Sequence, residues 1–481
     1  MRNVPEAVYI KTTFKRASNP LRVKSACLPS TPPPNPAQDL DQELSKQFKA
    51  TLRRVTDSDA AYWDYSSIKS NSNPQAYFQY PAMMVPRMQG DIIDAIQKVF
   101  PGTERTFDPF AGSGTILVES LKRGLNSLAT DINPMAILLC RVKTQPFRVN
   151  EAENAFKEVI NIAASDISDK IEIDYTNREK WFSLTSLIEL SRIRRAIVRI
   201  EDVELRRLLW VAFAEAIRIS SNSRTSTYKL HIRDSDDIER RSVGVKSRIN
   251  TSMTQVIDMY KKNYIQLKEA GILEENHFTK EAKILNHNIC SILKSEVADA
   301  LISSPPYGDN HTTVTYGQHS FLPLCWIPIN DIDSSLDATI IANTHSIDSA
   351  SLGGRREGAL TKRSKISERS NTLEELLNNP NVSKDAQQRL SVFFYDLDKG
   401  LANAISVLKP KSPIVLTLGN RCVSNQKVRM DKIVEELLIA QGCEFIDIHD
   451  RAIPTKRMAH RNQTAGTMLT ETLLIMRGPK L

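Results

Sequence analysis

The pattern of apolar and polar positions predicts an α/β protein whose strands fall into two blocks. Short apolar runs typical of buried strands occur at residues 106–107, 126–130, 282–286, 297–302, 414–418, 444–448 and 472–476. Helical periodicity follows several of them, as at residues 116–125, 384–408 and 433–440. Seven strands alternating with helices predict a doubly wound sheet, which binds ligands at the carboxyl ends of its strands.

A long helical segment separates the two blocks. Residues 148–280 show helical spacing of leucine and isoleucine, many charges and no convincing strand. We therefore expect four parts: a loosely held arm at 1–60, a first part of the α/β domain at 61–147, a helical insertion at 148–280, and a second part of the domain at 281–481, which includes a basic loop at 330–380.

A glycine-rich turn, Asp108–Thr115, follows the first predicted strand. Gly112 and Gly114 lack Cβ atoms and let a ligand approach the backbone. The helix start favours an anionic group on the ligand, while Asp108 can accept from an ammonium group. The turn lacks the lysine of a P-loop and the third glycine of a dinucleotide fingerprint, so we do not expect a phosphate ligand.

A carboxylate at the end of the second predicted strand, Asp131, suits a ribose diol. An adenosine ligand with a zwitterionic tail and no phosphates is S-adenosyl-L-methionine. The alternative interpretation is a glycine-rich turn in some other α/β protein.

A second chemical motif, Ser304-Pro305-Pro306-Tyr307, follows the apolar run at 297–302. The prolines fix the backbone and cannot donate hydrogen bonds, so a carbonyl can point at a ligand. The Ser304 hydroxyl and Pro305 carbonyl can hold the hydrogens of an exocyclic base amine and favour its attack on a methyl group. Tyr307 can stack on an extruded base.

The six cysteines are scattered, and no Pro-Cys pair occurs in the chain. The absence of that pair argues against methylation at cytosine C5, which needs a cysteine nucleophile. The scattered cysteines predict a reducing compartment and no metal site, and the sequence has neither an apolar run of membrane-spanning length nor a signal peptide. We expect a cytoplasmic protein without a metal or a membrane partner.

The two motifs, preceded by Tyr80-Pro81-Ala82, together resemble the amino-methylating DNA methyltransferases, particularly the N4-cytosine branch of restriction–modification systems. The resemblance covers residues from about 74 to 145 and from 281 to the end. Later segments that also look like that family are Tyr307–Gln318, Leu352–Gly354, Lys456–Met458 and Glu471–Ile475. It implies a Rossmann-like seven-stranded methyltransferase sheet, here with a helical insertion, and a cognate restriction endonuclease as a partner.

The resemblance also implies roles for individual residues. The implied cofactor-binding residues are Tyr80, Pro81, Ala82, Asp108, Pro109, Phe110, Gly112, Gly114, Thr115, Asp131 and Asn288, and the implied catalytic residues are Ser304, Pro305, Pro306 and Tyr307. The family commonly has lysine where Met83 or Met84 stands and an acidic residue where this chain has Asn288.

The formal net charge of +8 is consistent with a polyanionic partner such as DNA. The candidate DNA contacts are Arg218, Arg224, Lys229 and Arg233 near the end of the longest predicted helices, and Arg355 and Arg356 in the basic loop. A merely solvated loop is the alternative for these segments.

Several functions remain open on the sequence alone. Serine at position 304 favours cytosine N4 over adenine N6, because adenine enzymes more usually have an acidic or amide residue there. A guanine-N2 methyltransferase of tRNA is a further alternative, although those enzymes usually show Asp-Pro-Pro-Tyr and an N-terminal RNA-binding module. A non-catalytic nucleic-acid-binding subunit is a third, and the retention of Asp108 together with Ser304–Tyr307 argues against it.

Overall fold

The computed structural model describes residues 36–59, 62–65, 77–146, 148–241, 243–293, 295–309, 314–453 and 470–480. The chain divides into two compact units, Met1–Gln42 and Glu43–Leu481. Of the first unit only residues 36–42 are described, and the sheet and its helices belong to the second unit.

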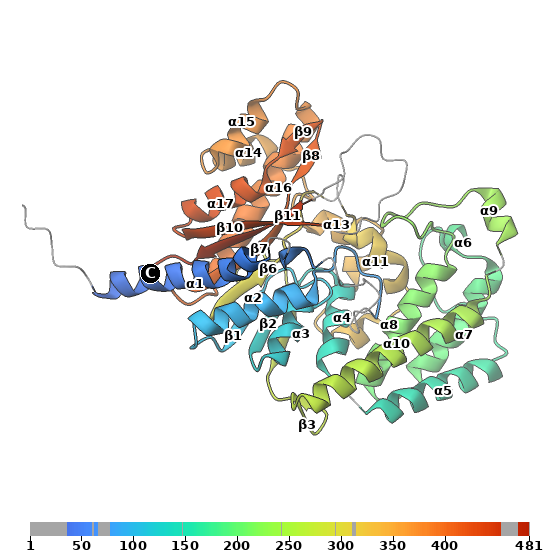
Figure 1. Cartoon of the computed structure of the whole chain (residues 1–481). Coiled ribbons are helices and arrows are strands. Elements are labelled where there is room, and N and C mark those ends of the chain that lie inside the picture. Colours follow the sequence, from blue (N-terminus) through green and yellow to red (C-terminus); the bar gives the residue numbers. More distant parts are fainter. Residues whose placement is uncertain are drawn as a thin grey trace, which may run out of the picture. The chain divides into compact units, whose positions relative to one another are not determined.

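A seven-stranded sheet forms the centre of this unit (Figure 1). Its strands, in spatial order, are β10 (Glu444–Ala452), β11 (Thr470–Arg477), β7 (Pro413–Gly419), β6 (Ala300–Ser303), β1 (Arg105–Asp108), β2 (Asn126–Asp131) and β5 (Ala282–Asn286). All neighbours are parallel except β11, which is antiparallel to β7 and β10. The predicted Rossmann-like seven-stranded sheet is confirmed. Chain order reverses between β1 and β6, where a doubly wound sheet binds its ligands.

Helices cover both faces of the sheet. On one face, α2 (Pro86–Val99) and α3 (Thr115–Lys122) bury Ile92 and Ile116 in a cluster with Ile302 of β6. On the other face, α16 (Lys384–Ile405) and α17 (Met430–Ala440) share a cluster with Leu301, the preceding residue of β6. Successive strand residues point to opposite faces, so the apolar runs of the sequence serve both layers.

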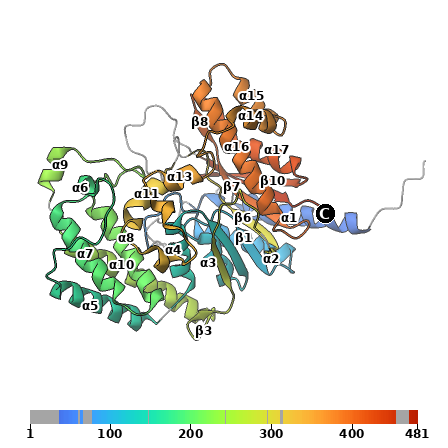
Figure 2. The ribbon, with the colours of Figure 1, turned by 180° about the vertical axis from the view of Figure 1, so that it is seen from behind.

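The helical insertion lies between α4 (Pro134–Thr144) and β5. Its helices are α5 (Val149–Ser165), α6 (Arg178–Trp181), α7 (Leu184–Val198), α8 (Val203–Ser220), α9 (Ser235–Arg240) and α10 (Val245–Glu269). Figure 2 shows α5, α7, α8 and α10 grouped together, away from α14–α17. Their core also includes α4 and α11 (Tyr316–Leu324). The sequence did not predict the short hairpin of β3 (Leu273–Glu274) and β4 (His277–Phe278).

Two segments differ from their sequence-based predictions. Residues 36–58 of the predicted loose arm form helix α1 (Pro36–Ser58), in which Phe48 and Leu52 are buried because their spacing gives the helix an apolar face. The predicted basic loop at 330–380 is largely helical. It contains η3 (Ala338–Ile341), α13 (Ser346–Ala350), α14 (Ala359–Ser367) and α15 (Asn371–Asn378), and α12 (Ile329–Ile332) overlaps its start. Residues 1–35 and Lys456–Met458 lie outside the described residues.

The remaining short elements are η1 (Tyr62–Asp64) and the hairpin of β8 (Arg421–Val423) and β9 (Gln426–Val428). Across the described ranges, no helix is long and apolar enough to cross a membrane. No group of three or more His, Cys, Asp or Glu side chains in those ranges is placed to hold a metal ion.

Candidate functional site

The glycine-rich turn joins β1 to α3 and needs glycine at two positions. Gly112 and Gly114 have φ angles of +49° and +75°, in the left-handed region that side chains disfavour. A Cβ on Gly114 would also lie 3.0 Å from Cys140 Sγ of α4. The turn therefore packs closely against α4, and α3 begins at Thr115, as the sequence predicts.

A buried lysine supports the same turn from behind. The Lys143 ammonium of α4 donates to the carbonyl of Ser113. Burial lowers the pKa of Lys143 to about 8. The sequence analysis missed this residue, because nothing in the local pattern of α4 distinguishes it from a solvated lysine.

Asp131 ends β2 beside the turn, and its carboxylate is held by two backbone groups. Oδ2 accepts from the N–H of Gly112 at 2.8 Å, and Oδ1 accepts from the N–H of Asn133 at 2.8 Å. Burial raises the pKa of Asp131, and both N–H groups oppose that shift. Each carboxylate oxygen keeps a second lone pair, so Asp131 can still accept from a pair of ligand hydroxyls.

Asp108 ends β1 and is fully buried. Its Oδ1 accepts from Ser303 Oγ at 2.5 Å and from the N–H of Phe110 at 3.1 Å. Its Oδ2 is buried and has no hydrogen-bond partner among the described residues. Burial raises the pKa of Asp108 to about 7. A buried carboxylate oxygen without a partner fits a nearby ligand cation, although Asp108 itself does not line the pocket described next.

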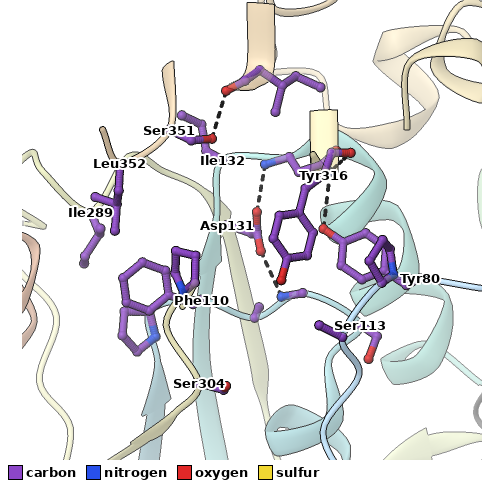
Figure 3. A pocket seen from close by; sticks show the side chains of 18 of the residues that line it. Tyr80, Phe110, Ser113, Asp131, Ile132, Ile289, Ser304, Tyr316, Ser351 and Leu352 are labelled. Carbon is purple, nitrogen blue, oxygen red and sulfur yellow. Dashed lines mark hydrogen bonds between the residues drawn. The ribbon is translucent and has the colours of Figure 1, made fainter. Parts of the chain in front are cut away.

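A pocket opens at the carboxyl ends of β1, β2 and β6 (Figure 3). The predicted site residues that line it are Tyr80, Pro81, Ala82, Pro109, Phe110, Gly112, Asp131, Asn288, Ser304 and Pro306. The predicted residues Asp108, Gly114, Thr115, Pro305 and Tyr307 are not among its lining residues. The lining residues that sequence analysis did not assign include Met83, Met84, Ser113, Ile132, Asn133, Ile289, Tyr316, Ile347, Ser351 and Leu352.

One side of the pocket is aromatic. The rings of Tyr80 and Tyr316 lie 5.9 Å apart between centroids, at 31°. Asn133 fixes this side, because its amide donates to Tyr80 Oη at 3.2 Å and to Ser320 Oγ at 2.9 Å while its oxygen caps α4 through the N–H of Met135. Asn133 is therefore the N-cap of α4.

The other side of the pocket is apolar. Figure 3 shows Phe110, Ile289 and Leu352 on the side of Asp131 away from Tyr80 and Tyr316. A planar base can lie against these apolar groups while its ribose reaches the carboxylate. The geometry therefore suits a nucleoside.

Asn288 stands where the resembling family commonly has an acidic residue. Its amide donates to the carbonyl of Ala350 at 3.2 Å, and its oxygen accepts from the N–H of Cys290 at 3.0 Å. The first bond holds the loop after β5 against the end of α13, and the second is a turn within that loop.

The Ser304–Tyr307 motif follows β6 and reaches the same pocket through Ser304 and Pro306. Ser304 Oγ lies 3.2 Å from Tyr307 Oη and 3.2 Å from the carbonyl oxygen of Thr417. Tyr307 Oη donates to Glu471 Oε1 at 3.0 Å, and burial raises the pKa of Tyr307.

Several candidate DNA contacts already have acidic partners. Arg218 pairs with Glu215 at 2.6 Å, and Arg224 pairs with Asp234 at 2.9 Å. In the second segment, Arg356 pairs with Asp385 at 2.6 Å. The other candidates are Lys229 and Arg233, which are half-buried, and Arg355, which is exposed. Their contact with DNA stays a prediction.

Comparison with known proteins finds DNA methyltransferases. Residues 90–319 match the family described as D12 class N6 adenine-specific DNA methyltransferase. The chain is 28% identical over 475 residues to the Type II methyltransferase M.MvaI of Kocuria varians, covering 91% of this chain and 98% of that protein. The Type II methyltransferase M.MjaII of Methanocaldococcus jannaschii is 25% identical over 119 residues, which are 25% of this chain and 22% of that protein.

Among solved structures, the rRNA methyltransferase aviRa from Streptomyces viridochromogenes aligns with a TM-score of 0.32 at 10% identity, covering 86% of this chain and 96% of that one. The sequence matches support an amino-methyltransferase in general. They do not separate cytosine N4 from adenine N6.

Proposed function

We propose that the protein transfers a methyl group from S-adenosyl-L-methionine to the N4 amine of cytosine in DNA. One observation carries the proposal: Ser304 of the second motif lines the same pocket as Gly112 and Asp131 of the first. The two motifs are almost 200 residues apart in the chain, and the switch point of the sheet brings them together.

The described residues fit this cofactor. Asp131 would accept from the ribose hydroxyls, and Phe110, Ile289 and Leu352 would contact the adenine. Asp108 directly precedes Pro109 and Phe110 of the pocket lining, and its carboxylate would attract the ammonium group by charge, without contact. The bound cofactor supplies an electrophilic methyl group.

The protein's own residues act on the amine. An exocyclic amine is a weak nucleophile, because its lone pair is delocalised into the base. Ser304 Oγ and the carbonyl of Pro305 would accept its hydrogens and favour the pyramidal nitrogen that attacks. A base inside a duplex cannot reach this pocket, so the target must be extruded, and we assign stacking on it to Tyr307.

The helical insertion, residues 148–280, and the segment around Arg355 and Arg356 are the proposed DNA contacts. Arg224 and Arg356 remain partly exposed in their ion pairs, so phosphates can compete with Asp234 and Asp385 for them. The Arg218 side chain is only 14% exposed and would have to leave Glu215 to reach a phosphate. A cognate endonuclease is part of the proposal, because the relative from Kocuria varians is a Type II methyltransferase.

Adenine N6 is the second candidate. The family matched by residues 90–319 is described as N6 adenine-specific, which favours adenine. Serine at position 304 favours cytosine, because it replaces the acidic or amide residue more usual for adenine. Both candidates use the same pocket and the same amine chemistry.

Product analysis tests the proposal. The purified protein is incubated with methyl-labelled cofactor and either unmethylated DNA or tRNA, and the nucleosides are identified by mass spectrometry. We expect labelled N4-methylcytosine from DNA. Labelled N6-methyladenine would establish the second candidate, modified guanine from tRNA would overturn both, and binding without label would indicate a non-catalytic subunit.

A further inference from the structure

Polar groups cross four neighbouring strands at the edge of the sheet that carries the pocket. They are Ser304 after β6, Thr417 of β7, Glu471 of β11 and Arg451 of β10. Arg451 pairs directly with Glu471 in the antiparallel ladder, so the two side chains share one face. We call these groups, with Tyr307, the edge network.

Short contacts connect the edge network from end to end. Arg451 Nη1 lies 3.6 Å from Glu471 Oε2, and the other carboxylate oxygen, Oε1, accepts from Tyr307 Oη at 3.0 Å. Ser304 Oγ lies within 3.2 Å of Tyr307 Oη and of the Thr417 carbonyl. The Arg451 side chain is only 4% exposed, and its guanidinium can only donate.

The chemistry of these groups fixes the direction of each hydrogen bond. An ionised carboxylate can only accept, so Tyr307 must give its single proton to Glu471. The Tyr307 oxygen can then only accept from Ser304, and the Thr417 carbonyl is also an acceptor. The Ser304 proton therefore stays inside the edge network, and a lone pair of Ser304 Oγ remains for the pocket.

We propose that Glu471 is a positioning residue for methyl transfer: through Tyr307, it keeps Ser304 Oγ free to accept from the target amine. This inference rests on the proposed function. Without an acceptor at position 471, the Tyr307 hydroxyl is free to donate to Ser304. Oγ then already accepts one hydrogen bond, so it is a weaker acceptor for the amine. Glu471 touches neither substrate nor cofactor in this scheme.

Glu471→Gln reverses this direction with little change in shape. Arg451 can only donate, so it attracts the amide oxygen and turns the amide nitrogen toward Tyr307. The amide then donates to Tyr307, whose proton points to Ser304. Glu471→Asp keeps an acceptor-only group, and Asp450→Asn is a matched control, because Asp450 accepts from Thr472 on the same strand pair but the opposite face.

The test is single-turnover methyl transfer to DNA at saturating cofactor and DNA, with the cofactor Kd measured beside it. We expect Glu471→Gln to slow transfer about tenfold or more, because the hydrogen bond from the reacting amine to Ser304 Oγ is weakened. The cofactor Kd should stay within about twofold of wild type. Asp450→Asn should keep the wild-type rate, and Glu471→Asp should recover part of it.

A double-mutant cycle separates this role from a structural one. If Glu471 acts through the Tyr307 hydroxyl, Glu471→Gln should cost nothing further in a Tyr307→Phe background. A wild-type rate in Glu471→Gln, or losses that add in the double variant, would overturn the inference while leaving the proposed function intact. A wild-type protein that methylates no base would instead remove the proposed function, and the inference with it.

Discussion

The carboxylate of Asp131 accepts a hydrogen bond from the backbone N–H of Gly112 at 2.8 Å. This bond joins the end of β2 to the turn after β1, two segments whose positions decide the shape of the pocket. The same carboxylate also holds the N–H of Asn133, the residue that caps α4 and fixes Tyr80. One side chain, which we propose as the ribose acceptor, therefore connects the glycine-rich turn to the aromatic side of the pocket.

Asp131→Asn should weaken cofactor binding by about tenfold or more. The amide has a single oxygen, so it cannot accept from both Gly112 and Asn133 and still bind two hydroxyls. Calorimetric titration with S-adenosyl-L-methionine gives the Kd, and Asp234→Asn, in an exposed ion pair of the insertion, is the control. Equal affinity in wild type and Asp131→Asn would remove Asp131 from the cofactor site.

Gly114→Ala and Gly124→Ala form a matched pair for the glycine turn. Both positions have positive φ, but an added Cβ meets nothing within 4 Å at Gly124 and lies 3.0 Å from Cys140 Sγ at Gly114. We expect Gly124→Ala to lower the free energy of unfolding by about 1 kcal/mol, the cost of the left-handed backbone, and to leave cofactor binding unchanged.

Gly114→Ala should cost more than Gly124→Ala and should also weaken cofactor binding. Chemical denaturation measures the free energy of unfolding of both variants, and titration gives their cofactor Kd. In a Cys140→Ala background, Gly114→Ala should lower the free energy of unfolding by less. Equal effects of the two glycine variants would show that the contact with α4 is unimportant.

Asp108 should make the cofactor-free protein less stable as the pH rises. Its pKa is raised by burial from the usual 3.8 to about 7, so the folded chain holds this proton more tightly than the unfolded chain. The contribution of this proton to the free energy of unfolding is fully present below about pH 4. It is lost as the pH rises to about 7, and the free energy of unfolding falls by about 1.4 kcal/mol per pH unit in between.

Urea denaturation between pH 4 and pH 8 measures this contribution as the difference between wild type and Asp108→Asn. The variant lacks the titrating group, so the wild-type stability should decline relative to the variant across that range. A difference that is constant with pH would show that Asp108 is ionised throughout.

The positions of the two motifs at the ends of β1, β2 and β6 could be predicted from sequence, because each motif directly follows an apolar run. Once the strands are parallel neighbours, Asp131 and Ser304 must lie at one edge of the sheet. Ile347 and Ser351 could not be predicted, because they belong to α13 and its end, and no local pattern shows where that helix docks.

The pattern of charged residues in the sequence was the least reliable guide to the structure. Lys362 was expected in a basic loop, but it lies on α14 and pairs with Asp396 of α16 at 3.0 Å. A run of cations in a sequence does not reveal the acids that folding brings beside it. Glu471 is the opposite case, because its link to Tyr307 arises only when β11 inserts between β7 and β10.

The central claim is that the two motifs form one methyl-transfer site, and single-turnover transfer by Ser304→Ala tests it most directly. The measurement uses saturating cofactor and DNA, with the cofactor Kd determined for the same protein. We predict that the transfer rate falls about tenfold or more while the Kd stays within about twofold of wild type, because the hydroxyl acts on the amine and not on the cofactor. An unchanged transfer rate would contradict the account.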